Sequence, residues 1–99
     1  MPVQERRLAA IMFTDIVGYT AMMEKNEDQA FETLRTNRKI HKELIRKYGG
    51  TWLKEIGDGI LACFSSTTMA VLCAQHIQLL AKKKDVPLRI GIHIGDVIF

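Results

Sequence analysis

Hydrophobic and polar residues follow one another along the chain in blocks that predict alternating strands and helices. An unbroken apolar run over residues 8–13 ends in Thr14 and Asp15, which is typical of a central strand buried on both faces. Residues 30–48 repeat apolar positions with a period of about 3.6, the pattern of an amphipathic helix. The predicted elements, in order, are a strand at 8–13, a short helix at 16–24, a helix that starts at an Asn26 cap and ends at 48, strands at 51–56 and 60–65, a helix from 66 or 67 to about 84, and a strand at 88–99.

Capping residues support the helix boundaries. Asn26, followed three residues later by Gln29, is close to a capping box, and Ser66 or Thr67 is a suitable N-cap for the last helix. The glycine pair at 49–50 predicts the C-terminal end of the long helix.

The segment Gly57-Asp58-Gly59 separates two predicted strands, and such a tight polar connection joins the antiparallel strands of a hairpin. The order strand, helices, strand, strand, helix, strand is that of the split βαβ pattern, in which an antiparallel sheet carries its helices on one face. We therefore expect an α+β fold with a ferredoxin-like core, an architecture that by itself names no activity.

The composition is that of one globular domain, with 99 residues of which 47% are hydrophobic and 25% charged. Fourteen Lys and Arg against eleven Asp and Glu give a net charge of +3, which favours anionic partners without requiring nucleic acid. No apolar run approaches the roughly 20 residues that span a bilayer, so we expect no membrane insertion.

Cys63 and Cys73 lie in apolar segments and are interpreted as reduced core thiols of a cytoplasmic protein. His41, His76 and His93 lack metal-ligand spacing, and we expect packing or surface roles for them.

Two carboxylates are the main candidates for chemistry. Asp15 follows the first predicted strand and Asp58 lies in the hairpin turn, and split βαβ topology places that strand beside the hairpin. Two converging aspartates repel each other unless a cation neutralises them, and Mg²⁺ commonly takes one or two carboxylates together with substrate phosphates. A divalent metal site for nucleotide chemistry is one interpretation. The other is that Asp15 caps the following helix and Asp58 is an ordinary turn residue.

The segment from Ile16 to Thr20 has the features of an anion site. It joins a strand to a helix, and the first N–H groups of a helix have no partner within it. Gly18 allows the backbone to approach a ligand closely. Phosphate is the anion that we expect there.

Three blocks of sequence resemble the class III adenylate and guanylate cyclase catalytic domain in their order and spacing. They are FTDIVGYT at 13–20, KEIGDG at 54–59 and LRIGIHIGDV at 88–97, and the resemblance runs along nearly the whole chain. The first two blocks are similar to the family's metal-binding signatures, and the third to its next strand. The resemblance implies that Asp15 bridges two metal ions, Mg²⁺ or Mn²⁺, that the Ile16 carbonyl ligates one of them, and that Asp58 completes the site.

The same resemblance implies how substrate is held. Val17, Gly18, Tyr19 and Thr20 match the family's triphosphate cradle, and Lys54 occupies the position that reads the purine, which is lysine in cyclases that use ATP and glutamate in those that use GTP. A lysine only donates hydrogen bonds and adenine N1 only accepts them, so ATP is the implied substrate. In homodimeric members of the family the aspartates and the lysine of one chain serve different active sites. Without the motif, Lys54 would be interpreted as a solvated strand residue.

The chain ends inside an apolar segment, whereas the family's domain continues into a second purine-selecting residue, an asparagine and an arginine that stabilise the transition state, and a dimerisation arm. We therefore expect residues 1–99 to be the N-terminal part of a single cyclase domain, inactive alone and without a catalytic residue of its own. The full-length parent is expected to convert ATP to cyclic AMP and pyrophosphate in cyclic nucleotide signalling. Two alternatives are a non-catalytic cyclase-like module for dimerisation or nucleotide binding, and an unrelated ferredoxin-like nucleic-acid binder.

Overall fold

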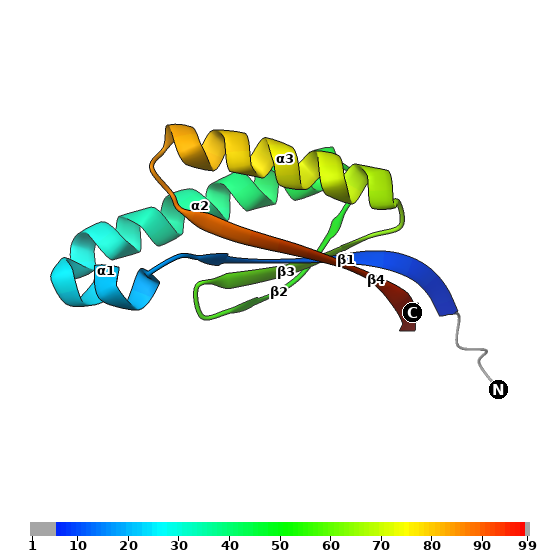
Figure 1. Cartoon of the computed structure of the whole chain (residues 1–99), viewed down its shortest axis with the longest axis horizontal. Helices are drawn as coiled ribbons and strands as arrows, with labels where there is room; N and C mark the ends of the chain where they lie inside the picture. Colours follow the sequence, from blue (N-terminus) through cyan, green and yellow to red (C-terminus); the bar gives the residue numbers. More distant parts are fainter. Residues whose placement is uncertain (1–5, 99) are drawn as a thin grey trace.

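The computed structural model describes residues 6–98, which form an antiparallel sheet with helices on one of its faces (Figure 1). The elements are β1 (Arg6–Ile16), α1 (Tyr19–Lys25), α2 (Glu27–Lys47), β2 (Thr51–Ile56), β3 (Gly59–Phe64), α3 (Thr67–Lys83) and β4 (Leu88–Ile98). The predicted elements are confirmed, although residue 99, the end of the last predicted strand, lies outside the described residues. The first strand is longer than predicted, because it begins at Arg6 and still includes Asp15 and Ile16, and the short helix begins at Tyr19 rather than at residue 16.

The strand order is β2-β3-β1-β4, which confirms the split βαβ arrangement. β1 is central and pairs with β4 along its whole length and with β3 over residues 10–14, where Thr14 lies opposite Ile60. This register brings the β2–β3 turn beside the end of β1 that carries Asp15.

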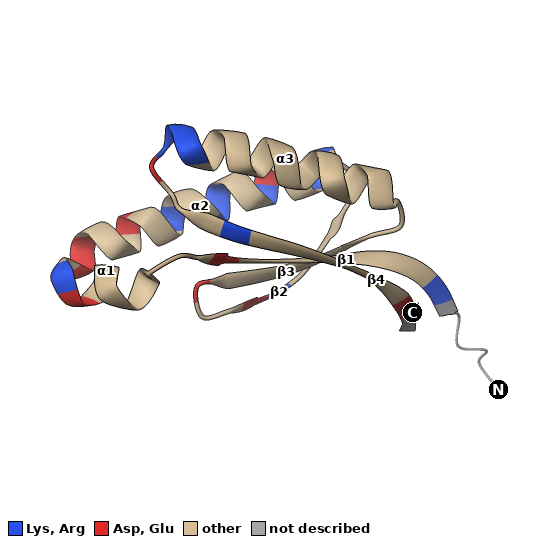
Figure 2. Cartoon of the chain, in the orientation of Figure 1, with Lys and Arg blue, Asp and Glu red and all other residues tan. Residues whose placement is uncertain are grey.

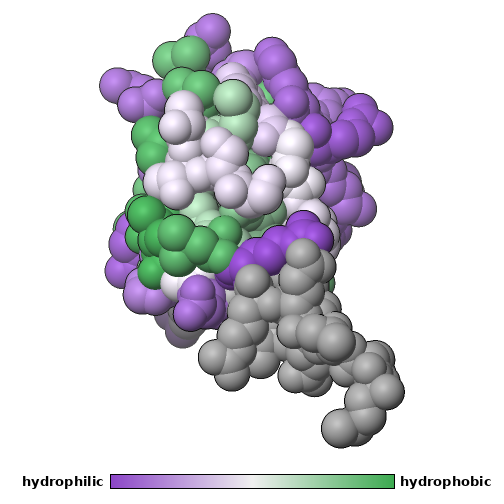
Figure 3. Space-filling model, turned by 90° about the vertical axis from the view of Figure 1, so that its right-hand side faces the viewer, coloured by the Kyte–Doolittle hydropathy of each residue, from purple (hydrophilic) through white to green (hydrophobic). Residues whose placement is uncertain are grey.

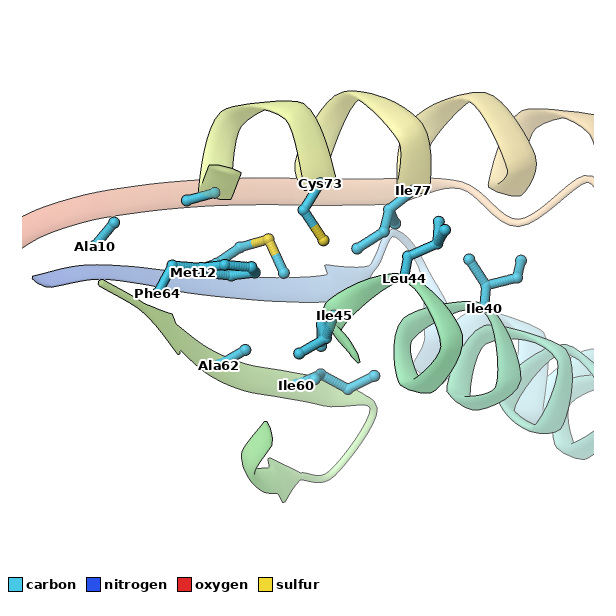
Figure 4. Close-up of a cluster of buried hydrophobic side chains, with 11 residues drawn as sticks. Ala10, Met12, Ile40, Leu44, Ile45, Ile60, Ala62, Phe64, Cys73 and Ile77 are labelled. Atoms are coloured by element: carbon cyan, nitrogen blue, oxygen red, sulfur yellow. The ribbon is translucent and has the colours of Figure 1, made fainter. Parts of the chain in front are cut away.

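The core lies between the sheet and the two long helices, α2 and α3 (Figure 4). Side chains alternate across a strand, so every second residue of β1 and β3 points toward the helices. The main buried cluster consists of Ala10, Met12, Ile60, Ala62 and Phe64 from the sheet and Ile40, Leu44, Ile45, Ala70, Cys73 and Ile77 from the helices. Truncation of a large member of such a cluster to alanine costs about 2–5 kcal/mol.

The prediction that the first strand is buried on both faces is wrong. Phe13 points away from the helices and is 53% exposed, whereas its neighbours Met12 and Thr14 are buried. α2 and α3 lie on the same side of the sheet, and α1 packs against α2 beyond the end of β1 (Figure 1). An apolar run therefore identifies a central strand without showing that both faces are covered within the chain. We call the bare side of the sheet the open face, and it carries Ile11, Phe13, Asp15, Lys54, Leu61 and Arg89.

The helix ends follow the predicted caps. Asn26 Oδ1 accepts a hydrogen bond from the Gln29 N–H at 3.1 Å, and Ser66 Oγ accepts one from the Met69 N–H at 3.2 Å, so Ser66 rather than Thr67 is the cap. Gly49 follows α2 with a φ of 75°, a left-handed value that favours glycine at the end of a helix.

Charged and apolar residues are distributed unevenly over the surface. Lysines gather at the C-terminal end of α3 and basic residues follow α2 (Figure 2), while Figure 3 shows hydrophobic surface on one side of the end-on view and hydrophilic surface on the other. Within residues 6–98, none of the helices combines the length and the hydrophobicity that crossing a bilayer requires. Cys63 and Cys73 are both buried with free thiols, as predicted, and burial raises the pKa of the Cys73 thiol to about 11.

Candidate functional site

Asp15 lies one residue before the end of β1, on the open face of the sheet. Its neighbours Thr14 and Ile16 point to the opposite side, where both are buried. The Asp15 side chain is 43% exposed. It therefore stands at the sheet end where the chain turns into α1, accessible to a ligand.

Asp58 is the second residue of the two-residue turn between β2 and β3. The first, Gly57, has a φ of 60°, which glycine adopts without the strain that a side chain would bring. Asp58 Oδ2 accepts a hydrogen bond from the Ile16 N–H at 2.8 Å. This bond holds Asp58 beside the residue that follows Asp15, so the predicted convergence of the two aspartates is observed.

Both aspartates line a hollow of about 260 Å³ between the end of β1 and the hairpin. The lining residues are Phe13, Thr14, Asp15, Ile56, Asp58, Gly59, Ile60 and Leu61. A larger hollow of about 760 Å³, between the end of α3 and the start of β4, contains neither predicted aspartate. The two aspartates predicted as metal ligands therefore share the smaller hollow.

The donor set of the smaller hollow fits a hard divalent cation. Mg²⁺ commonly takes one or two carboxylates from a protein and fills its remaining positions with water and substrate phosphate. Within the part of the chain that the structure describes, no group of three or more His, Cys, Asp or Glu side chains is arranged to hold a metal ion. The site therefore offers two carboxylates, and a metal ion there would depend on a ligand for further coordination. Ligation by the Ile16 carbonyl stays a prediction.

Arg89 is a residue of the site that the sequence reasoning missed. It lies directly opposite Asp15 in the β1–β4 pairing, and its Nε and Nη2 atoms donate to Asp15 Oδ1 at 2.9 Å and to Oδ2 at 3.1 Å. These hydrogen bonds and the charge of Asp15 raise the pKa of Arg89, and the charge of Asp58 acts in the same direction. The antiparallel register of β1 and β4 places Arg89 opposite Asp15, and a prediction of that register would have identified the pair.

The predicted phosphate cradle forms the turn from β1 into α1. The Val17 N–H donates to the Pro87 carbonyl at 2.8 Å, so this amide is already engaged. Gly18 is the N-cap of α1 with a φ of 71°, and no side chain caps the helix. Tyr19 and Thr20 begin the helix, where N–H groups have no intrahelical acceptor. Contact of Gly18, Tyr19 and Thr20 with phosphate stays a prediction, and Val17 could join them only by giving up its bond to Pro87.

Lys54 lies on β2 opposite Leu61 of β3, and both point to the open face. The pairing is interrupted between Trp52 and Lys54 by a bulge at Leu53, so Trp52 packs against the core while Lys54 faces the other way. From two strand spacings and two residues along the sheet, the Cα atoms of Lys54 and Asp15 lie about 12 Å apart. Lys54 therefore lies on the same face of the sheet as Asp15 but outside direct contact with it.

Three polar residues are buried directly behind the strand end that carries Asp15: Thr14, Asn37 and His41. His41 Nδ1 lies 2.8 Å from the Asn37 carbonyl oxygen, and His41 Nε2 lies 2.8 Å from Thr14 Oγ1. A carbonyl only accepts, so Nδ1 carries the proton and the Thr14 hydroxyl donates to Nε2. Burial lowers the pKa of His41, opposed in part by the bond to Asn37. The packing role expected for His41 is confirmed.

Known proteins are similar to this chain in sequence and in fold. The family model of the adenylate and guanylate cyclase catalytic domain matches residues 1–99. Over 94% of its length the chain is 35% identical to "Putative adenylate cyclase 3" of Rhizobium meliloti (strain 1021), of which it covers 17%. Among solved structures, the adenylate/guanylate cyclase/hydrolase from Silicibacter pomeroyi is 36% identical with a TM-score of 0.82, over 98% of this chain and 62% of that one. The guanylyl cyclase Cya2 is 26% identical with a TM-score of 0.84, over 96% of this chain and 57% of that one. The chain thus spans less than two thirds of each of these relatives.

Proposed function

The chain belongs to the adenylate and guanylate cyclase catalytic domain family, and on this premise we propose that it supplies the metal-binding part of an adenylate cyclase. In the proposed reaction the ribose 3′-hydroxyl of ATP gives its proton to solvent water and attacks the α-phosphate. The bond from the α-phosphorus to the oxygen bridging to the β-phosphate breaks, and cyclic AMP and pyrophosphate form. The observation that carries the proposal is that Asp15 and Asp58 line one hollow, where the Ile16 N–H holds Asp58 in place. Family membership excludes the alternative of an unrelated nucleic-acid binder.

In this proposal Asp15 and Asp58 hold Mg²⁺ or Mn²⁺, two ions per site. When bound, the ions lower the pKa of the ribose hydroxyl and neutralise charge on the phosphates. The chain's own residues bind the ions and orient the substrate. The Ile16 N–H fixes the Asp58 carboxylate, and the half-exposed position of Asp15 leaves room for phosphate oxygens beside it. The amides of Gly18, Tyr19 and Thr20 receive the triphosphate at the start of α1.

Lys54 selects adenine over guanine in the proposal. Its exposed ammonium on the open face is free to donate to adenine N1, and guanine presents an N–H at the same place. The relatives include proteins named adenylate cyclase and others named guanylyl cyclase, so the lysine is the feature of this chain that favours ATP.

The site is completed by a second copy of the protein at the open face. Phe13 is 53% exposed and Ile56 is 63% exposed on this side, an apolar surface that suits a protein interface. In the homodimer Asp15 and Lys54 of one chain serve different active sites, and the groups that stabilise the transition state come from beyond residues 1–99. The proposal includes a cytoplasmic location, where ATP is available, and a role in cyclic nucleotide signalling.

Replacement of either aspartate by asparagine tests the proposal. Asp15→Asn or Asp58→Asn should abolish Mn²⁺-dependent ATP binding by the chain and cyclase activity of the full-length protein, because each removes half of the carboxylate charge of the site. Circular dichroism should be unchanged, since asparagine at 58 can still accept the hydrogen bond from the Ile16 N–H.

Asp28→Asn is a matched control, because Asp28 is an exposed acid in the first turn of α2. It should leave binding and activity as they are. Full activity of both site variants would refute the metal-site proposal. Mn²⁺-dependent ATP binding without cyclic AMP formation by the full-length protein would point instead to a non-catalytic nucleotide-binding module.

A further inference from the structure

Both oxygens of the Asp15 carboxylate are occupied by one side chain. Arg89 donates from Nε to Oδ1 at 2.9 Å and from Nη2 to Oδ2 at 3.1 Å, the two-pronged geometry that arginine forms with carboxylates. Antiparallel pairing places the two residues directly opposite each other on the open face. The contact is therefore a direct consequence of the strand register.

The two aspartates of the hollow are satisfied in different ways. Asp58 Oδ2 accepts a hydrogen bond from a backbone N–H, which is neutral, and Arg89 acts on Asp58 only through the attraction between their charges. Asp15 is neutralised by a full positive charge. Of the two proposed carboxylate ligands, only Asp15 forms a salt bridge with a competing cation within the described residues.

The Arg89–Asp15 pair is also exposed enough for another cation to replace Arg89. The side chains are 73% exposed for Arg89 and 43% exposed for Asp15. Ion pairs at such positions contribute little net free energy, because water solvates both partners well when they separate. A divalent cation carries twice the charge of a guanidinium and is therefore attracted more strongly to the same carboxylate.

We infer that Arg89 is an internal counter-cation, which a divalent metal ion must displace from Asp15 before that carboxylate can ligate it. The inference rests on the proposed metal site. Arg89 then lowers the metal affinity of the empty site, and by linkage metal binding frees the Arg89 side chain. The pair keeps Asp15 neutralised until metal arrives, so Arg89 sets the metal concentration at which the site fills.

Mn²⁺ titration of the 99-residue chain, followed by the electron paramagnetic resonance signal of free Mn²⁺ without nucleotide, tests this. Arg89→Ala should bind Mn²⁺ about two- to five-fold more tightly than wild type, the range that loss of a competing exposed ion pair allows. Arg89→Lys, which keeps the charge but not the two-pronged contact, should fall between the two. Arg35→Ala is the matched control, because Arg35 is 70% exposed and pairs with Glu32 within α2; it should bind as wild type does.

A second measurement follows Arg89 itself. In the wild-type chain, the Nε–H resonance of Arg89 should move on addition of Mg²⁺ toward the position of solvated arginines, and in Asp15→Asn it should start there. Unchanged or weaker Mn²⁺ binding by Arg89→Ala, wild-type affinity in Arg89→Lys, or a resonance insensitive to Mg²⁺ would each overturn the inference. If Asp15→Asn still abolishes Mn²⁺ binding in that case, the metal site stands and only the role of Arg89 fails. Absence of Mn²⁺ binding in both wild type and Arg89→Ala would overturn both.

Discussion

Acidification should destabilise the protein through His41, which is fully buried and hydrogen-bonded through both ring nitrogens. Burial places the folded-state pKa of His41 below the ordinary value of 6.5. The unfolded chain therefore takes up a proton at a pH where the folded chain does not. The stabilisation is fully present above pH 6.5 and is lost as the pH falls from there toward the lower pKa of the folded state.

The size of the effect follows from one proton. Between the two pKa values the free energy of unfolding falls by at most about 1.36 kcal/mol for each pH unit. The polar groups that contact the His41 ring are the Thr14 hydroxyl and the Asn37 carbonyl, and neither titrates. Protonation makes Nε2 a donor, so the Thr14 hydroxyl must stop donating to it and has to rotate inside a packed core.

Urea unfolding between about pH 8 and about pH 5.5 measures the slope. The comparison is wild type against the double variant Thr14→Val/His41→Leu, which removes both partners and leaves no unsatisfied hydroxyl; such paired replacements are close to neutral. The single variant Thr14→Val should cost about 1–3 kcal/mol, because it leaves Nε2 buried without a donor. The two proteins differ in no ionisable group other than His41, so the difference between the two curves isolates His41. Parallel curves for wild type and the double variant would refute the reasoning.

Two further predictions concern the proposed activity. Lys54→Glu in the full-length protein should lower ATP turnover and raise the relative use of GTP, because a mismatched polar contact costs about 1–3 kcal/mol; steady-state rates with both nucleotides measure this, and an unchanged ratio would remove Lys54 from the site. The 99-residue chain alone, assayed with ATP and Mn²⁺, should form essentially no cyclic AMP, because the expected transition-state groups lie outside it and each such donor is worth on the order of 10² to 10³-fold. It should also self-associate, as measured by light scattering, through apolar surface such as Phe13. Rates of cyclic AMP formation near those of the full-length protein would contradict the proposal that the transition-state groups lie outside residues 1–99.

The sequence predicted the strand order and the meeting of the two aspartates, because the split βαβ pattern leaves little freedom in where the hairpin lies. It did not predict that Phe13 is exposed. Hydrophobicity shows that a side chain avoids water without showing whether a helix of the same chain or another surface covers it. The Thr14–His41 bond joins residues 27 apart, and its formation depends on how α2 is rotated against β1, which periodicity alone does not fix. Arg89 was missed because residue pairing across two strands requires their register.

The bulge at Leu53 lets one short strand place Trp52 against the core and Lys54 on the opposite side of the sheet. In a regular strand Trp52 and Lys54, two residues apart, would point the same way, and either the tryptophan would leave the core or the lysine would enter it. Because of the extra residue, Trp52 can pack in the core while Lys54 points to the open face. The residue types in the first half of β2 are therefore constrained by packing, and those in the second half by contacts on the open face. Substitutions at position 54 should therefore leave the hydrophobic interior undisturbed, so under the proposed function a change of purine preference would be compatible with the same fold.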